Sequence, residues 1–355
     1  MARVAESGTN VTGKFPIYYA QFARSYMRGE LRQARRLAET FLRDAELGGH
    51  ATEAAVAGRI LGSTCLLQGD LVEAKALLER ALADYTASLD AEARVRFGHD
   101  VRPIAAANLA SATWLLGEAE SARRFAELAI RSAAELGHAQ TSTNAHTYLA
   151  MFEARRNDFA AALRLAEEVL FDARKHEMDL WVAFGEIFAA WAHGRRDDSQ
   201  AGAPALRRAL ANYLNQGNKL FAPLFHGMLA DLEAETIGLD AALTLIDEGL
   251  GFSEETSERF SDPYLHRLRG DILLKRDPAN PAPAEEAFRA AVAIAQAQKA
   301  RSFELLASLS LAKLYQSPGR PAEARATLGP ALKGFSPTPE MPEIAEALAL
   351  MERLA

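Results

Sequence analysis

Apolar side chains recur along this 355-residue chain at intervals of three and four residues, a pattern that predicts amphipathic helices throughout. Short turns separate the helices at nearly constant intervals. The turn positions are Gly29, Gly69, Gly117, Asn157, Asp197, Ile237, Asp277 and Gly319. Successive positions are 40 residues apart, except for one step of 48 and one of 42. This regularity indicates about eight tandem helical hairpins rather than a set of unrelated domains.

The best-defined unit shows what each position does. Gly69 permits a sharp turn, while Gly62 and Ala74 remove side-chain bulk where two antiparallel helices cross. These offsets resemble the tetratricopeptide repeat, and they recur over residues 109–129, 149–169 and 311–331. The resemblance implies an all-α fold with a period near 40 residues, about 17 helices and a right-handed superhelical solenoid.

Two intervals are longer than the others, and we expect long loops there. One lies between Ala83 and Asp100 and includes a charged run at residues 90–96, and the other is the proline-rich segment 277–283. Near the end of the chain, prolines again interrupt the helical pattern before an amphipathic stretch at residues 343–354. That stretch is expected to cap the stack of repeats.

The predicted organisation therefore has three parts. Residues 1–14 are polar and are expected to be a disordered N-terminal segment, residues 15–336 form the repeat array, and residues 337–355 form a proline-rich linker and capping helix.

Composition restricts the kinds of partner and compartment. The net charge is −7, and basic residues are scattered among carboxylates, so nucleic acid is not expected as a partner. A single cysteine, Cys65, implies a reducing compartment. No stretch approaches the roughly 20 apolar residues that span a bilayer, and no signal peptide is recognisable. We expect a cytoplasmic protein without a membrane partner.

No catalytic pattern is present, so the chain is not expected to be an enzyme. Phosphate-binding glycine loops, zinc-protease motifs and nucleophile turns are all missing from the sequence. His138 and His146 lie about two helical turns apart but lack further ligands for zinc, and no cofactor is implied. The most serious helical enzyme alternative, an α/α-toroid glycosidase, would need catalytic carboxylates from long loops.

At the level of the whole chain, residues 15–354 resemble the repeat region found C-terminal to predicted AAA-type ATPases and class III adenylate or guanylate cyclases in bacteria. The segments that carry this resemblance are 97–100, 180–185 with Trp191, 265–274, 300–314 and 319–325. The resemblance implies a regulatory or assembly role in ATP-dependent signalling, without cyclase or ATPase activity in this polypeptide. Similar arrays in large transcriptional regulators sense small ligands.

The resemblance to tetratricopeptide repeats also implies where a partner binds, because the first helix of each such pair lines a concave groove. The corresponding positions are Tyr19, Arg59, Ser63, Trp114, Asn144, Thr147, Met151, Arg155, Trp191, Asp231, Arg267, Asp271 and Lys313. Such a surface suits a protein or peptide, and it could equally enclose a small molecule. The two tryptophans could instead pack between repeats, and Arg267 could simply pair with Asp271.

His99 and Asp100 lie at the predicted start of a long helix, after the first insertion. Asp100 could cap the helix amides near Pro103, which is the structural interpretation. The alternative is that both residues face a ligand at the mouth of the insertion.

Two non-enzymatic functions follow from these observations. The first is a protein-interaction scaffold that serves as a regulatory or assembly module of an ATPase or cyclase signalling system. The second is a small-ligand sensor, which requires the superhelix to close tightly enough to bury the polar groove residues with the tryptophans.

Overall fold

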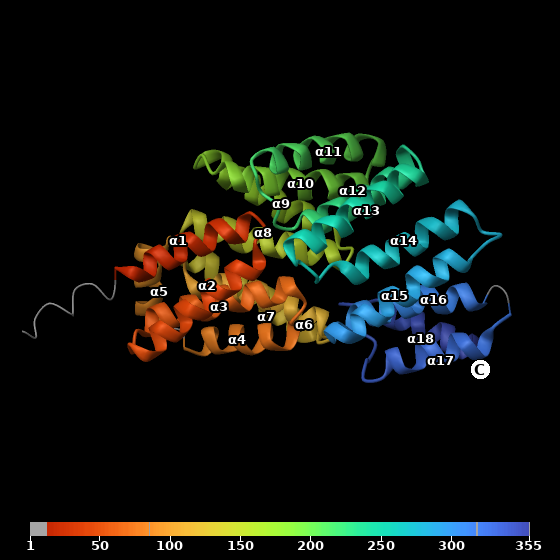
Figure 1. Ribbon diagram of the computed structural model, residues 1–355, viewed down its shortest axis with the longest axis horizontal. Helices are drawn as coiled ribbons and strands as arrows, with labels where there is room; N and C mark the ends of the chain where they lie inside the picture. The colour runs from red at the N-terminus through yellow and green to blue at the C-terminus, as the bar shows by residue number, and fades with distance from the viewer. Residues whose placement is uncertain (1–12, 85, 317–318, 355) are drawn as a thin grey trace, which may run out of the picture.

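The computed structural model describes residues 13–84, 86–316 and 319–354, and these residues form eighteen α-helices and no strand (Figure 1). Sixteen helices form eight antiparallel pairs. In chain order the pairs are α1 (Lys14–Met27) with α2 (Leu31–Leu47), α3 (Ala51–Gln68) with α4 (Leu71–Ala83), α6 (Val101–Leu115) with α7 (Ala119–Leu136), α8 (Ala139–Arg155) with α9 (Phe159–Lys175), α10 (Asp179–Arg196) with α11 (Ser199–Asn215), α12 (Ala222–Thr236) with α13 (Leu239–Thr256), α14 (Asp262–Arg276) with α15 (Ala282–Gln298), and α16 (Arg301–Gln316) with α17 (Pro321–Leu332). The all-helical repeat fold is therefore confirmed.

The two remaining helices lie outside this pairing. α5 (Ala87–Phe97) occupies the first long interval, where the sequence pattern led us to expect a loop. It is a helix because Ala93 and Phe97, one turn apart, are buried against the array, while Arg96 pairs with Glu53 of α3. The expectation of about 17 helices is corrected to eighteen for this reason. α18 (Glu343–Leu354) packs on α17 and α16.

The turn chemistry inferred from the sequence is present in the structure. Gly69 ends α3 in the left-handed conformation, with φ +85°, and Asn157 adopts φ +59° at the corresponding turn after α8. A Cβ on Gly62 would lie 2.7 Å from Leu78 of α4. The small residue therefore sets the close approach of α3 and α4.

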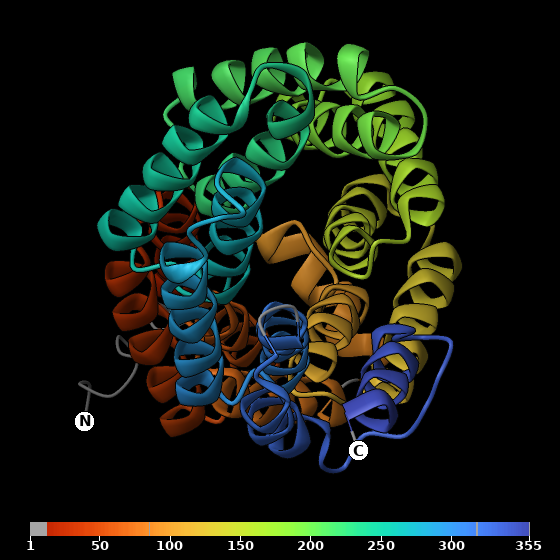
Figure 2. The same cartoon turned by 90° about the vertical axis from the view of Figure 1, so that its right-hand side faces the viewer.

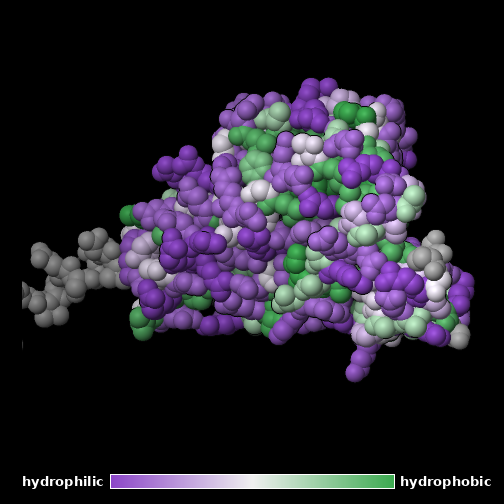
Figure 3. Space-filling model, turned by 45° about the vertical axis from the view of Figure 1, so that its right-hand side comes forward, coloured by the Kyte–Doolittle hydropathy of each residue, from purple (hydrophilic) through white to green (hydrophobic). Residues whose placement is uncertain are grey.

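The pairs wind around a common axis for more than one turn. Viewed along that axis, the helices form a ring, and the blue C-terminal helices lie in front of the red and orange N-terminal ones (Figure 2). The face shown in Figure 3 is largely hydrophilic, with hydrophobic spots scattered among polar side chains. None of the described helices has the length and apolar character needed to cross a bilayer.

The second turn of the superhelix docks directly on the first, along a contact line that we call the seam. At the ends of α1, α3 and α6, backbone carbonyls accept hydrogen bonds from residues that belong to the second turn. The bonds are Lys219 N to Met27 O at 2.9 Å, Arg259 N to Leu67 O at 2.8 Å, and Ser302 Oγ to Trp114 O at 2.5 Å. The Met27 and Leu67 carbonyls, which their own helices leave without a partner, are thereby satisfied, while Trp114 O also accepts from Gly117 N at 2.9 Å.

An ion-pair network extends the seam to the end of α8. Glu340, just before α18, pairs with Arg123 at 2.8 Å and with Arg156 at 2.6 Å, and both arginines also pair with the buried Glu153. The four seam contacts thus join α1, α3, α6 and α8 to the beginnings of α12, α14, α16 and α18. Each of the first three pairs meets the fifth pair after it. The fourth pair meets α18, which lies where the first helix of a ninth pair would lie.

Candidate ligand cavity

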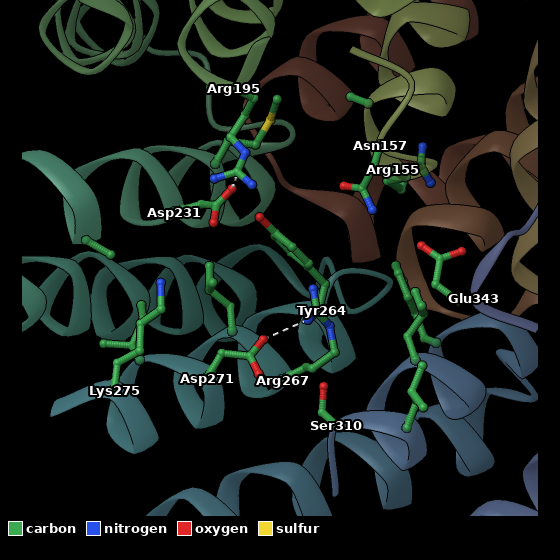
Figure 4. A pocket seen from close by; sticks show the side chains of 18 of the residues that line it. Arg155, Asn157, Arg195, Asp231, Tyr264, Arg267, Asp271, Lys275, Ser310 and Glu343 are labelled. Carbon is green, nitrogen blue, oxygen red and sulfur yellow. Dashed lines mark hydrogen bonds and ion pairs between the residues drawn. The ribbon is translucent and has the colours of Figure 1, made fainter. Parts of the chain in front are cut away.

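The winding encloses a cavity of about 710 Å³ inside the C-terminal half of the ring (Figure 4). First helices build its wall: side chains come from the end of α8 and from α10, α12, α14 and α16, and α18 contributes Glu343 and Glu346. First helices line the interior because the second helices of the pairs lie outside them. The cavity therefore lies on the inner side of the superhelix and is partly open to solvent.

Charged side chains on the wall are mostly paired with each other. Arg195 lies 3.4 Å from Asp231 and 3.2 Å from Glu235, and Arg267 donates a 2.7 Å hydrogen bond to Asp271. The first of these pairs and the Arg267–Asp271 bond are drawn in Figure 4. Burial raises the pKa of Asp231, although Arg195 opposes that shift. These pairs stiffen the wall and leave few free charges inside it.

Aromatic rings supply flat apolar surface between the ion pairs. Trp191 of α10 meets Phe159 edge-on, with ring centroids 5.3 Å apart, and Arg195 lies over the same Phe159 ring at 5.6 Å. Tyr264 of α14 extends toward Arg195 and Asp231 in the close-up (Figure 4). Such a wall combines apolar area with a few oriented polar groups, as ligand sites in proteins do.

Seven of the thirteen groove residues expected from the sequence line this cavity. They are Met151, Arg155, Trp191, Asp231, Arg267, Asp271 and Lys313. Arg267 and Asp271 pair with each other, which is the alternative to partner binding that their spacing suggested. Lys313 pairs with Glu346 of α18 at 2.7 Å.

The other six groove residues lie outside the cavity wall. Five of them, in the N-terminal half, are Tyr19, Arg59, Ser63, Asn144 and Thr147, and all except the half-buried Tyr19 are buried. The Ser63 and Thr147 hydroxyls donate to carbonyls of their own helices. Trp114, the sixth, is 2% exposed and meets Phe303 edge-on at 5.7 Å across the seam. Packing is therefore its observed role.

Asp100 lies at the N-cap position of α6, as expected, but its side chain caps no helix amide. The buried carboxylate instead accepts a 2.8 Å hydrogen bond from Thr141 of α8 and pairs with Arg94 of α5. The capping interpretation is wrong because the insertion folds as a helix and brings Arg94 to this carboxylate. His99 lies beside the Tyr19 ring, and burial lowers its pKa to about 3.

Sequence reasoning missed several residues of the wall. Phe159 was overlooked because it begins a second helix, although it follows the turn at Asn157 directly. Arg195 follows Trp191 by four residues on α10, and this helical spacing could have identified it. No group of three or more histidine, cysteine, aspartate or glutamate side chains with metal-site geometry occurs within the described ranges.

A fully buried carboxyl group lies where the cavity wall meets the seam. Glu258 Oε2 accepts a 2.8 Å hydrogen bond from Phe221 N, while Oε1 has no hydrogen-bond partner among the residues that the structure describes. Burial raises the pKa of Glu258 to about 8, and the nearby Asp262 adds to the shift. The folded protein therefore holds a proton on Glu258 near neutral pH.

This proton makes stability depend on pH with a defined sign. A carboxyl whose pKa is higher in the folded state stabilises the fold at low pH, and that contribution is lost as pH rises from about 4.5 to about 8. We expect the free energy of unfolding to fall across this window by up to about 1.4 kcal/mol per pH unit. Urea denaturation of wild type and Glu258→Gln at several pH values measures it. Parallel pH profiles for the two proteins would contradict the assignment.

The comparison with known families agrees with this geometry. A family model described as "Tetratricopeptide repeat" matches residues 55–80, which span α3 and α4, and residues 144–168, which span α8 and α9. The chain carries tetratricopeptide repeats. The two matches fall on the second and fourth helical pairs of the array.

Known relatives are distant. An uncharacterized protein of Rhizobium meliloti (strain 1021) is 24% identical over 243 residues, which are 68% of this chain. The chain spans about a quarter of the length of that relative.

Similar solved structures have low sequence identity to the tetratricopeptide array. One is a signal transduction ATPase with numerous domains and a tetratricopeptide repeat sensor from Pyrococcus horikoshii. The match has 11% sequence identity and a TM-score of 0.49, and it covers 99% of this chain and 50% of that chain. Another is the apo form of the quorum sensor NprR of B. thuringiensis, with 14% identity, 89% and 86% covered, and a TM-score of 0.48.

Proposed function

We propose that this tetratricopeptide array is a non-catalytic sensor module that holds a small molecule in its interior cavity. The observation that carries the proposal is the enclosure of about 710 Å³ by the first helices of the pairs, α8 to α16, and by α18. Ligand sites in proteins have volumes of roughly 300–1,000 Å³. The cavity also has the composition of such sites, since paired charges alternate with aromatic and aliphatic side chains.

The winding favours a small occupant over a helix. The second turn docks on the first along the seam, so the inner surface is not one continuous open groove along which a long helix could lie. Trp191, which is 4% exposed, supports a ligand sensor, although the polar groove residues Asp231, Arg267 and Asp271 beside it are only half-buried.

A protein-interaction scaffold remains the second candidate, and one observation favours it. Large apolar side chains are exposed on second helices at the outside of the ring: Leu47 on α2, Val72 on α4 and Phe171 on α9. In this version of the proposal, the outer surface docks another protein of an ATP-dependent signalling system, such as its ATPase or cyclase domain.

Filling the cavity separates the two functions. Ser310 of α16 lines the cavity, so Ser310→Trp occupies ligand space, whereas Ala211→Trp adds the same side chain to the exposed outer face of α11. A metabolite screen by thermal unfolding should find compounds that stabilise wild type and Ala211→Trp but not Ser310→Trp. At a ligand concentration 100 times the dissociation constant, the stabilisation is about 2.7 kcal/mol.

Equal stabilisation of both tryptophan variants would overturn the sensor proposal, because the compounds would then bind elsewhere. A protein partner retained equally by wild type and Ser310→Trp, but lost on Phe171→Asp, would establish the scaffold in its place.

A further inference from the structure

One cation on the cavity wall has no counter-ion. Arg195, Arg267 and Lys313 are each paired with a carboxylate, and Lys275 is exposed. Arg155 forms no ion pair with any described residue. Its guanidinium is held only by long hydrogen bonds, from Nε to Met151 O at 3.3 Å and from Nη2 to Ser111 Oγ at 3.4 Å, and by the Phe260 ring at 5.1 Å.

Glu258 is the carboxyl group whose charge acts on Arg155, but it forms no hydrogen bond with the guanidinium. Its Oε2 accepts from Phe221 N, and its Oε1 has no partner among the described residues. Burial lowers the pKa of Arg155 to about 9, and the charge of Glu258 opposes that shift only in part. A desolvated, unpaired guanidinium destabilises a folded protein unless an anion accompanies it.

One further N–H group on the same wall also lacks an acceptor. Trp191 Nε1, like Arg155 Nη1, has no hydrogen-bond partner within the described part of the chain, whereas Arg195 Nε lies 3.4 Å from an oxygen of Asp231. Both unpartnered groups are donors, so a ligand with acceptor oxygens suits this wall. An oxyanion supplies such oxygens and also provides the missing charge.

The charge on the wall limits that oxyanion to a single negative charge. Five cationic side chains face five carboxylates: Arg155, Arg195, Arg267, Lys275 and Lys313 against Asp231, Glu235, Asp271, Glu343 and Glu346. The carboxylates would repel a multiply charged phosphate. Between the charges, the wall is apolar, with Met151, Met228 and Leu268 among its side chains.

We propose that the ligand is an amphiphilic carboxylic acid whose carboxylate pairs with Arg155 and whose apolar body lies against the aliphatic and aromatic wall. This inference rests on the proposed sensor function. It names the chemistry of the ligand and makes Arg155 its anchor, since a planar carboxylate accepts two N–H groups of a guanidinium.

Binding of matched probes tests the anchor. Decanoate, decanamide and decyl phosphate are titrated calorimetrically into wild type, Arg155→Met and a control, Arg208→Met, which removes an exposed arginine of α11. We expect decanoate to bind wild type and Arg208→Met more tightly than decanamide does. Arg155→Met should weaken decanoate binding by about 10- to 100-fold and leave decanamide binding unchanged.

The unliganded proteins provide an independent readout. Met replaces the apolar stem of Arg and carries no charge, so Arg155→Met removes an unpaired charge and should raise the melting temperature by about 2 °C. An arginine with a purely structural role would instead lower it when replaced. Arg155→Lys should keep part of the preference for decanoate, because the charge remains while the planar fork is lost.

The outcomes distinguish a failure of the carboxylic-acid proposal from a failure of the sensor function. If decanamide binds as tightly as decanoate, or only decyl phosphate binds, and Ser310→Trp abolishes that binding, the cavity is a ligand site but the carboxylate assignment is overturned. If Ser310→Trp leaves decanoate binding intact, the sensor function itself fails. If none of the probes binds wild type, the carboxylic-acid proposal is overturned.

Discussion

Gly29→Ala is expected to destabilise the protein by about 2–5 kcal/mol, more than the left-handed backbone of its turn explains. Gly29 has φ +73°, and left-handed backbone costs a non-glycine residue about 1–2 kcal/mol. A Cβ there would also lie 2.5 Å from Thr256 Cγ2 and 3.1 Å from Lys219 Cβ, both across the seam. Overpacking of this kind adds about 1–3 kcal/mol. Chemical denaturation followed by circular dichroism measures the loss.

Gly319 provides the matched control. It has the same backbone conformation, φ +74°, at the turn of the eighth pair, but a Cβ there would meet no atom of the described residues within 4 Å. Gly319→Ala should therefore show the backbone cost alone, about 1–2 kcal/mol. Equal losses for the two variants would mean that the seam contributes nothing at Gly29, contrary to the packing described above.

Phe225→Ala is expected to cost about 3–5 kcal/mol. Phe225 of α12 is fully buried in an aromatic cluster, with ring centroids 5.7 Å from Phe188 and Tyr213 and 6.1 Å from Phe184 and Phe221. Truncation leaves a void among rings whose positions the neighbouring helices fix, so the site cannot collapse easily. The free energy of unfolding from urea titration gives the magnitude.

Phe171 of α9 is the control for this substitution, since its side chain is 70% exposed. Phe171→Ala should change stability by no more than about 0.5 kcal/mol. A loss at Phe225 as small as that at Phe171 would show that the cluster is loosely packed.

The helical pairs could be predicted from the sequence because local residues encode them. Gly69 and Asn157 set turns, and Gly62 sets a helix crossing, all within a few residues of the contacts they control. α5 escaped prediction because its charged run hid the spacing of Ala93 and Phe97. The seam could not be predicted, since its contacts join residues as far apart as 217 positions, and three of the four use backbone carbonyls, which carry no sequence signature.

The candidate site was predictable in part, because the repeat pattern shows which residues of each first helix face the axis of the superhelix. Trp191 and Asp231 were identified from that pattern. Which of these residues line open space depends on the winding. Packing buries Arg59 and Trp114, whereas Arg155 stays on a free wall. That difference arises from contacts between turns, which a repeat pattern does not contain.

The five-pair register of the seam changes how the array should unfold. In an open solenoid, a pair touches only its neighbours along the chain, so the ends can fray one repeat at a time. Here Met27, Leu67, Trp114 and Arg156 tie the first four pairs to the sixth through ninth positions, so the N-terminal end is held by the C-terminal half. Fraying at either end must break the contacts with the neighbouring pair and also the contacts across the seam. Melting should therefore be a single cooperative transition, with the slow folding that long-range contacts impose.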